Sequence, residues 1–264
     1  MKIIVCIKQV PDTAGGVKFK PDGTLDRAAM LAIMNPDDKA GLEAALRIKD
    51  ETGAEVTVLT MGLPKAADVL REAIAMGADK GVLLTDRKLG GADTWATSST
   101  LAAGIRKIGD YDLIITGRQA IDGDTAQVGP QIAEHLGIPV ISYAQAVKVN
   151  EAEKTVEVER QFDDRYHVLK AKMPCLITAL SELNPPRYMT PAGIWDAVDA
   201  EITTYNRDDL TTLKDEDCGL AGSPTKIAKA SDKVRKGAGT MFKDLDPDAG
   251  AAVICEELTK RHYI

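Results

Sequence analysis

Short apolar runs alternate with helix-start signals through the first 142 residues, and this alternation constrains the fold more than any other feature. Apolar runs of strand length occupy residues 3–7, 55–60, 81–85, 113–116 and 140–142. Parallel strands that are covered on both faces read as such continuous apolar runs. We therefore predict an α/β fold with a doubly wound, mostly parallel sheet and right-handed connections.

Four segments carry signals for the start of a helix between these strands. Residues 35–38 read Asn-Pro-Asp-Asp, which offers a cap, a proline for the first helical position and acids for the first turn. Pro64 and Asp93 mark the second and third starts, and Asp93 is expected to cap a helix that runs to about residue 108. The fourth helix is expected over residues 125–136.

The pattern changes after residue 142. Residues 155–161 and part of 165–172 alternate apolar and polar side chains, and Asp163 and Asp164 lie between the two segments. This arrangement predicts a β-hairpin. Residues 174–178 then return to a buried strand. The predicted sheet therefore has an antiparallel hairpin at its edge.

The composition changes again beyond residue 183. Residues 184–187 read Asn-Pro-Pro-Arg, which excludes a helix or a central strand. Residues 200–246 show little periodicity and cannot bury a core alone, whereas a last helix is expected from Pro247 to about residue 261. We predict an α/β nucleotide-binding domain over 1–183. The remainder, 184–264, is predicted to be a linker and a C-terminal arm that packs on a partner subunit.

Composition excludes several classes of function. Among 264 residues, a net charge of -7 and only 4% aromatic residues argue against a nucleic-acid binder or a ligand of anionic membranes. No apolar run reaches the length of about 18 residues that membrane insertion needs. The four cysteines and three histidines show no metal-ligand spacing, so we predict no metal site. Reduced thiols in a cytoplasmic protein are expected.

The turn after the strand at 113–116 is the strongest candidate for a binding site. Open α/β sheets bind nucleotides outside the carboxyl ends of their strands. Arg118 and the backbone amides of the following helix start suit a phosphate group, although neither GxGxxG nor GxxxxGKS is present. Asp122 and Asp124 suit such a turn if one of them binds a ribose or ribityl hydroxyl. The alternative is that both bind their own backbone as Asx turns do.

Other segments are expected to face the same crevice. Cys6 and Met61 end two predicted strands, and Asn35 and the residues 93–97 open two predicted helices. Each has a purely structural alternative: Asn35, for example, caps its helix whether or not a ligand binds. No Gly-x-Ser-x-Gly elbow is present, so we assign no catalytic side chain.

The chain resembles the β subunit of electron-transfer flavoproteins, and the matches run nearly end to end. They cover residues 5–12, 35–36, 75–79, 117–124, 158–164 and 173–178. The resemblance implies pairing with an α subunit that holds a redox FAD. In that family the β subunit binds AMP in the ordinary type and a second FAD in the electron-bifurcating type.

The resemblance also implies individual residues. The cofactor-binding residues would be Cys6, Asn35, Asp38, Met61, Thr94, Thr97, Gly117, Arg118, Gln119, Ala120, Asp122, Gly123, Asp124, Thr125 and Gln127. A loop over residues 179–187 would dock an acyl-CoA dehydrogenase through Leu183, Asn184, Pro185 and Arg187. Without the resemblance, this loop would be interpreted as a proline-stiffened linker.

Three segments are similar to the bifurcating type. They are residues 90–98, which place Thr94 and Thr97 beside a FAD, the acids at 37–38, and residues 221–225. This likeness implies that FAD takes a hydride from NADH. One electron would pass to ferredoxin or flavodoxin and the other, through the α-subunit FAD, to an acyl-CoA dehydrogenase. The alternatives are an ordinary member with structural AMP, and an unrelated adenine-nucleotide sensor or ATP-hydrolysing module.

Overall fold

The computed structural model describes residues 1–12, 31–225 and 237–264. The chain divides into two compact units between Thr225 and Lys226. The first unit thus continues past residue 183, where we placed the end of the nucleotide-binding domain, and its last forty residues complete the sheet and one face of the core.

A nine-stranded sheet forms the first unit, in the order β11-β5-β4-β1-β6-β10-β7-β8-β9. The strands that pair only in parallel are β1 (Lys2–Cys6), β4 (Glu55–Met61), β5 (Lys80–Leu84), β6 (Leu113–Gly117), β10 (Cys175–Ala179) and β11 (Ile202–Tyr205). Strand β7 (Val140–Asn150) is parallel to β10 and antiparallel to β8 (Thr155–Gln161), which pairs with β9 (Tyr166–Lys172). The predicted mixed sheet with an antiparallel hairpin edge is confirmed.

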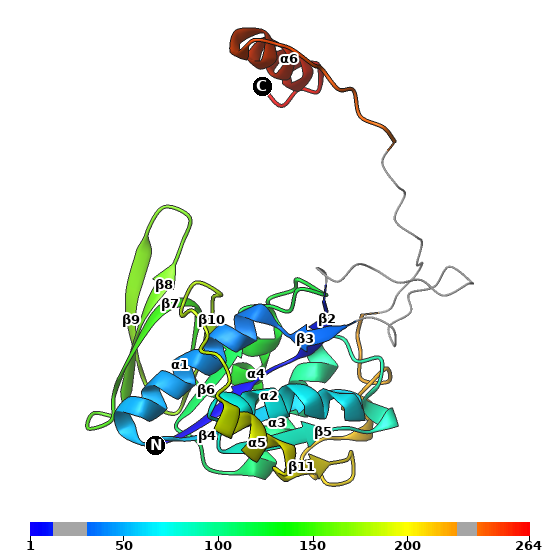
Figure 1. Cartoon of the computed structure of the whole chain (residues 1–264). Coiled ribbons are helices and arrows are strands. Elements are labelled where there is room, and N and C mark those ends of the chain that lie inside the picture. Colours follow the sequence, from blue (N-terminus) through cyan, green and yellow to red (C-terminus); the bar gives the residue numbers. More distant parts are fainter. Residues whose placement is uncertain (13–30, 226–236) are drawn as a thin grey trace. The chain divides into compact units, whose positions relative to one another are not determined.

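Helices cover both faces of the parallel part (Figure 1). Helices α1 (Pro36–Thr52) and α2 (Ala67–Met76) share a core with Ile3 and Val5 of β1. Helices α3 (Thr94–Ile108) and α4 (Val128–Leu136) share the opposite core with Ile4 and Cys6. Successive residues of a strand point to opposite faces, so one apolar run supplies both cores.

The strand order places a crevice beside β1. The chain moves outward from β1 to β4 and β5, and then returns to place β6 on the other side of β1. In the parallel register, Cys6 at the end of β1 lies opposite Leu59 of β4 and Thr116 of β6. The connections leave these strand ends in opposite directions, which is the switch point where open α/β sheets bind ligands.

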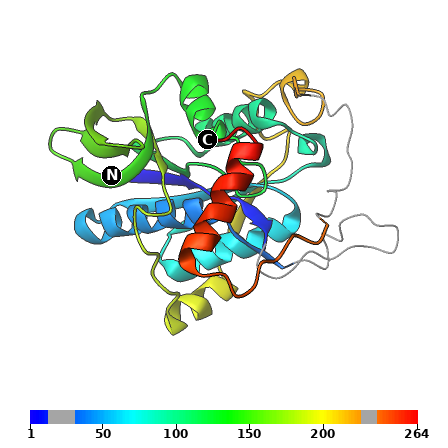
Figure 2. The ribbon, with the colours of Figure 1, turned by 90° about the horizontal axis from the view of Figure 1, so that it is seen from above.

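Two sequence-based boundaries differ from the structure. Helix α4 begins at Val128 and not at Thr125, because Asp124 and Ala126 adopt left-handed backbone angles, with φ of 51° and 54°. The strand expected over 140–142 extends to Asn150, where it turns into β8 to make a second hairpin. Figure 2 shows this β7–β9 extension at one side of the first unit, as Figure 1 does.

Several elements carried no strong sequence signal. Strands β2 (Gln9–Pro11) and β3 (Ala32–Met34) pair in a small antiparallel sheet. The described residues include the 3-10 helices η1 (Pro64–Ala66), η2 (Arg87–Leu89) and η3 (Asp215–Asp217), and η1 takes the expected helix start at Pro64 before α2 begins. Strand β11 lies in the stretch 200–246, where we expected little periodicity, and helix α5 (Pro191–Val198) lies just before that stretch, within the part predicted to be a linker and arm.

In the described part of the second unit, residues 237–264, the predicted helix is present as α6 (Pro247–Lys260). The Asp246 side chain accepts a hydrogen bond from the Ala249 amide and caps its start. No residue of α6 is buried within the described part of the chain, and Ile254 is 62% exposed. Among the described residues, no helix is both long and apolar enough to cross a membrane.

Candidate functional site

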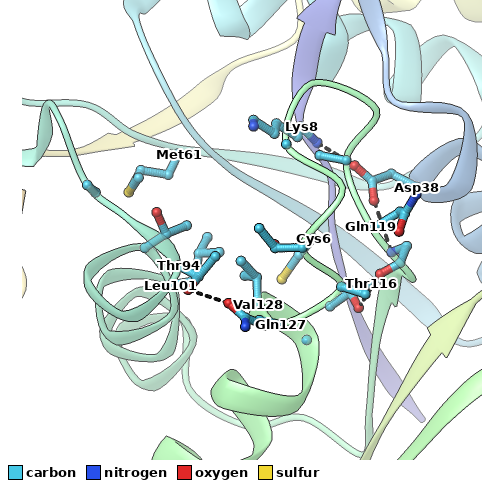
Figure 3. Close-up of a pocket in the computed structure, with 18 of the residues that line it drawn as sticks. Cys6, Lys8, Asp38, Met61, Thr94, Leu101, Thr116, Gln119, Gln127 and Val128 are labelled. Carbon is cyan, nitrogen blue, oxygen red and sulfur yellow. Dashed lines mark hydrogen bonds between the residues drawn. The ribbon is translucent and has the colours of Figure 1, made fainter. Parts of the chain in front are cut away.

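A cavity of about 560 Å³ opens at the carboxyl ends of β1, β4 and β6, between the starts of α3 and α4 (Figure 3). Its size falls within the roughly 300–1,000 Å³ typical of cofactor sites. Residues from all these elements line it: Cys6, Ile7, Lys8, Asp38, Met61, Gly62, Leu89, Gly91, Ala92, Asp93, Thr94, Thr97, Leu101, Thr116, Gly117, Arg118, Gln119, Ala120, Gly123, Asp124, Thr125, Ala126, Gln127, Val128 and Gly129.

The structure brings together nearly all of the residues that the sequence assigned to cofactor binding. Two of them, Asn35 and Asp122, do not line the cavity. Both are nevertheless joined to its walls, Asn35 through the turn that follows β6 and Asp122 through Lys8. Their contribution to the site is therefore indirect in this geometry.

Asn35 holds the turn that follows β6. Its Nδ2 donates to the Gln119 carbonyl at 2.8 Å, and its Oδ1 accepts from the Ile121 amide at 3.1 Å. Asn35 occupies the N-cap position of α1, as expected, and its carbonyl accepts from the Lys39 amide, but its side chain forms no capping hydrogen bond among the described residues. The Asn35 side chain is fully buried, and its hydrogen bonds connect the start of α1 to the turn after β6, which lies far away in the sequence.

Asp38 lies under the cavity and joins two strand ends. Its two carboxyl oxygens accept hydrogen bonds from the backbone amides of Lys8, at 2.8 Å, and Gly117, at 2.9 Å. Burial raises the pKa of Asp38 to about 7, although these amides oppose the rise. A side chain at Gly117 would place its Cβ 2.2 Å from Asp38 Oδ1, so the close approach requires glycine here.

The two acids of the turn each have a partner within the chain. Lys8 Nζ lies 2.7 and 2.8 Å from the two carboxylate oxygens of Asp122. The Gln119 side-chain amide donates to Asp124 Oδ1 at 2.8 Å. Lys8 therefore neutralises the charge of Asp122, and the hydrogen bond from Gln119 occupies one oxygen of Asp124.

The start of α4 leaves two backbone amides without intrahelical partners on this side of the cavity. Val128 and Gly129 line the cavity, and within the described residues no side chain caps the helix. The first amides of a helix lack intrahelical partners and attract anions. Arg118 adds positive charge, with its Nε 3.4 Å from Asp37 Oδ2, and neither atom forms a hydrogen bond with any described residue. This wall has the donors that a phosphate needs.

The start of α3 forms the opposite wall and is built differently. The Asp93 side chain caps the helix, as predicted, by accepting from the Ala96 amide at 3.0 Å. Burial opposes ionisation of Asp93, but hydrogen bonds from Thr225 and Ala96 outweigh it and lower its pKa. Thr94 Oγ1 donates to Gln127 Oε1 at 2.9 Å and connects the two walls, as Figure 3 shows.

Apolar side chains complete the cavity. Met61 and Leu101 lie near Thr94 in Figure 3, and Val128 stands near Cys6. Burial raises the pKa of the Cys6 thiol to about 12, so it remains protonated near neutral pH and is not a nucleophile. Within the described residues, no three His, Cys, Asp or Glu side chains are grouped to hold a metal ion.

Sequence analysis did not single out Lys8, Leu89, Leu101 or Gly129. Lys8 lies two residues after the end of β1, so its place near a strand end was a usable signal. Leu101 follows Thr94 and Thr97 by seven and four positions, a spacing that puts all three on one helix face. For Leu89 and Gly129 only the tertiary contacts reveal the role, and a Cβ on Gly129 would lie 2.6 Å from Thr116 Oγ1.

The predicted docking residues lie away from the cavity. Leu183 packs against the core, and Asn184 is buried, so neither presents an exposed anchor. Arg187 is fixed to α1, with its Nε 2.9 Å from Glu43 Oε2 and its Nη2 2.8 Å from Asp50 Oδ2. The exposed apolar side chains follow Arg187: Tyr188 is 95% and Trp195 78% exposed.

Comparison with known proteins agrees with the family resemblance. Residues 22–210 match the family model described as the electron transfer flavoprotein domain. Over the full length of both chains, this chain is 50% identical to caffeyl-CoA reductase-Etf complex subunit CarD of Acetobacterium woodii and 51% identical to electron transfer flavoprotein subunit beta of Clostridium acetobutylicum. It is 47% identical, again over both full lengths, to acryloyl-CoA reductase electron transfer subunit gamma of Anaerotignum propionicum.

Proposed function

Because this chain belongs to the electron transfer flavoprotein family, as a beta subunit of an electron transfer complex, we propose that its cavity binds FAD in an electron-bifurcating complex. The observation that carries the proposal is a cavity with one wall built for phosphate and the other lined by Thr94, Thr97 and Leu101. When bound, FAD would accept a hydride from NADH and pass single electrons toward ferredoxin or flavodoxin and toward the α-subunit FAD.

The phosphate-side wall would orient the cofactor. The uncapped amides of Val128 and Gly129 face the cavity, and Pro130 after them has no N–H to offer. Arg118 lies on the same wall with a buried Nε that forms no hydrogen bond to the described residues. Asp124 remains able to accept from a sugar hydroxyl, because Gln119 occupies only its Oδ1.

The opposite wall would hold the ring system. Met61, Leu89 and Leu101 supply apolar surface, and Thr94 and Thr97 supply hydroxyls at the start of α3. Asp93 caps that helix start by accepting from the Ala96 amide, so that amide is not left for a phosphate. The two walls therefore differ in chemistry, which suits a cofactor with a charged end and a flat apolar end. AMP, the alternative ligand, carries a phosphate and one flat ring, adenine, and lacks the second ring system, the isoalloxazine, that FAD would place on this wall.

The named relatives support a role in a larger complex. Two of them are named as electron transfer subunits of caffeyl-CoA reductase and acryloyl-CoA reductase systems. For this chain we propose an α subunit as the permanent partner and an acyl-CoA dehydrogenase as the exchanging one, in the cytoplasm. The exposed apolar side chains of α6, such as Ile254, support burial of the arm against a partner.

Dehydrogenase docking is proposed for the segment that Arg187 anchors. The ion pairs of Arg187 with Glu43 and Asp50 fix the chain just before Tyr188. Tyr188 and Trp195 then present apolar surface to solvent. Aromatic side chains on a rigid support are typical anchors of protein interfaces.

The test is flavin content and NADH reactivity of the co-expressed heterodimer. Two FAD per heterodimer and bleaching of flavin absorbance by NADH are expected. One FAD with one AMP, or no bleaching by NADH, would show that the ordinary type is present instead. A colourless chain that purifies without a partner would favour an adenine-nucleotide sensor or ATP-hydrolysing module.

A pair of variants connects the function to this cavity. Thr94→Ala removes the hydrogen bond to Gln127 and a hydroxyl of the cavity wall, and we expect FAD on this chain to bind on the order of tenfold more weakly. Thr212→Ala is the matched control, because Thr212 is exposed and does not line the cavity. Equal FAD occupancy in both variants would count against the assigned site.

A further inference from the structure

The segment from Gly219 to Thr225 lies against the loop that leads into α3. The Leu220 amide donates to the Gly90 carbonyl at 3.0 Å. The contact is close on both sides: a Cβ on Gly91 would lie 3.2 Å from the Leu220 Cβ, and one on Gly219 would lie 2.0 Å from the Lys88 carbonyl oxygen. The two backbones therefore approach more closely than side chains would allow.

Ser223 makes the central contact of this segment. Its Oγ accepts from the Asp93 amide at 2.8 Å and lies 2.8 Å from the Gly219 carbonyl oxygen, to which it donates. The residue is buried and does not line the cavity. Removing the hydroxyl would leave the Asp93 amide without this acceptor, and an unsatisfied buried amide is costly.

Asp93 is shared between the helix and the segment. Its Oδ1 accepts from the Ala96 amide in the first turn of α3, and its Oδ2 accepts from the Thr225 amide at 2.9 Å. The two oxygens of the Asp93 carboxylate therefore bind two different parts of the chain. Movement of Thr225 would displace Asp93 and, with it, the helix start that carries Thr94 and Thr97.

We propose that Ser223 is a positioning residue for FAD, acting through Asp93 to hold the α3 wall of the cavity. The inference rests on the proposed function and deepens it. The phosphate-side wall is built independently, from the turn after β6 and the start of α4. We call residues Gly219–Thr225 the clasp. A ligand that needs both walls, such as FAD, depends on the clasp. AMP bound on the phosphate-side wall does not.

Asp86 supplies a matched control elsewhere in the same unit. Like Asp93, it caps a helix start, accepting from the Lys88 amide at 2.9 Å, and its other oxygen accepts from a distant amide, that of Arg207, at 3.1 Å. Asp86 does not line the cavity. Replacing either acid with serine retains a residue that can cap the helix and removes the second link.

The experiment compares Ser223→Ala, Asp93→Ser and Asp86→Ser in the co-expressed heterodimer. FAD and, separately, AMP are titrated, and the thermal midpoint is recorded for each variant. We expect Ser223→Ala and Asp93→Ser to weaken FAD binding on the order of tenfold, with AMP affinity unchanged. Asp86→Ser should leave both affinities at the wild-type value.

Three outcomes would overturn the inference. Wild-type FAD affinity in Ser223→Ala would show that the clasp does not position the cofactor. A loss of AMP affinity as large as the loss of FAD affinity, together with a lower thermal midpoint, would show a general structural role. The same FAD loss in Asp86→Ser would show that the effect does not depend on the contact of Ser223 with Asp93. If the wild-type heterodimer itself binds no FAD on this chain, the proposed function fails, and that result is distinct because it precedes any substitution.

Discussion

The starts of α1 and α3 both carry polar side chains near the cavity, but these side chains bind different kinds of backbone group. At α1, Asn35 and Asp38 bind backbone groups of other segments, namely the turn after β6 and the ends of β1 and β6. At α3, Asp93 binds the Ala96 amide of its own helix and shares the rest of its carboxylate with Thr225. Similar sequence signals therefore lead to different partners.

The difference follows from what lies next to each helix start. The start of α1 packs directly on the backbone at Gly117, where strand-end amides are buried and need acceptors. Asp38 is the nearest acceptor and is only 7% exposed. The start of α3 borders the cavity instead, so its own amides need a cap. Burial of neighbouring amides, and not helix propensity, decides which groups a polar side chain binds.

The largest expected effect breaks the close contact at α1. Gly117→Ala would place a Cβ 2.2 Å from Asp38 Oδ1 and 2.7 Å from the Asp38 amide nitrogen. Because backbone must move to relieve this overlap, we expect a loss of at least about 3 kcal/mol in the free energy of unfolding. Urea unfolding of the heterodimer measures it.

Gly123→Ala is the control for that substitution. Gly123 lies in the same turn, but a Cβ there would meet no atom of the described residues within 4 Å. Its expected effect is within about 0.5 kcal/mol. A similar cost for both alanines would mean that the turn as a whole, and not its contact with α1, is sensitive to substitution.

A second prediction separates a bridge from a cap. Serine and asparagine are equivalent caps, so Asn35→Ser would be harmless if Asn35 capped α1. Because Asn35 instead pairs with the Gln119 carbonyl and the Ile121 amide, we expect a loss of about 2–3 kcal/mol in unfolding free energy. In Asp93→Ser the serine can still cap α3, and only the hydrogen bond from the Thr225 amide is lost, so we expect a loss of about 1 kcal/mol in unfolding free energy. Equal costs for the two serines would remove the distinction.

The pH dependence of stability sharpens the comparison between the two acids. Burial raises the pKa of Asp38 in the folded state from 3.8 to about 7, so between these values the folded chain holds a proton that the unfolded chain has lost. Stability from Asp38 is therefore fully present below pH 3.8 and declines toward pH 7, by up to about 1.4 kcal/mol per pH unit.

The measurement is the difference in unfolding free energy between wild type and Asp38→Asn from about pH 2 to pH 8. This difference should fall with rising pH and level off above about 7. The pKa of Asp93 is lowered in the folded state. The difference in unfolding free energy between wild type and Asp93→Asn should therefore shrink as the pH falls below the usual pKa of an aspartate. Parallel profiles for the two acids would contradict their opposite environments.

Much of the fold was predictable because it depends on local patterns. The apolar runs located β1, β4, β5, β6 and β10 to within a residue or two, and Asp93 and Pro247 marked the starts of α3 and α6. Strand β11 was not predictable in this way. Ile202 and Tyr205 are only partly buried, so the four-residue strand lacks the apolar run that identifies a central strand.

The site was predictable as a set of residues and not as a set of contacts. Position at strand ends and helix starts brought Cys6, Met61 and Thr94 to one cavity. The pairing of Lys8 with Asp122 joins residues 114 positions apart, and no local pattern encodes it. Leu183, expected to be an exposed anchor, packs on the core because its neighbours in space, and not in sequence, cover it.

The sequence by itself determined the alternating strands and helices, the family and the edge of the sheet at which polar residues gather, since all three depend on periodicity and on order along the chain. Only the tertiary structure decided that Asn35 and Asp38 serve buried amides, that α4 begins uncapped at Val128, and that Ser223 supports Asp93. These outcomes depend on which backbone groups lose water when distant segments meet, and each buried group then requires a partner.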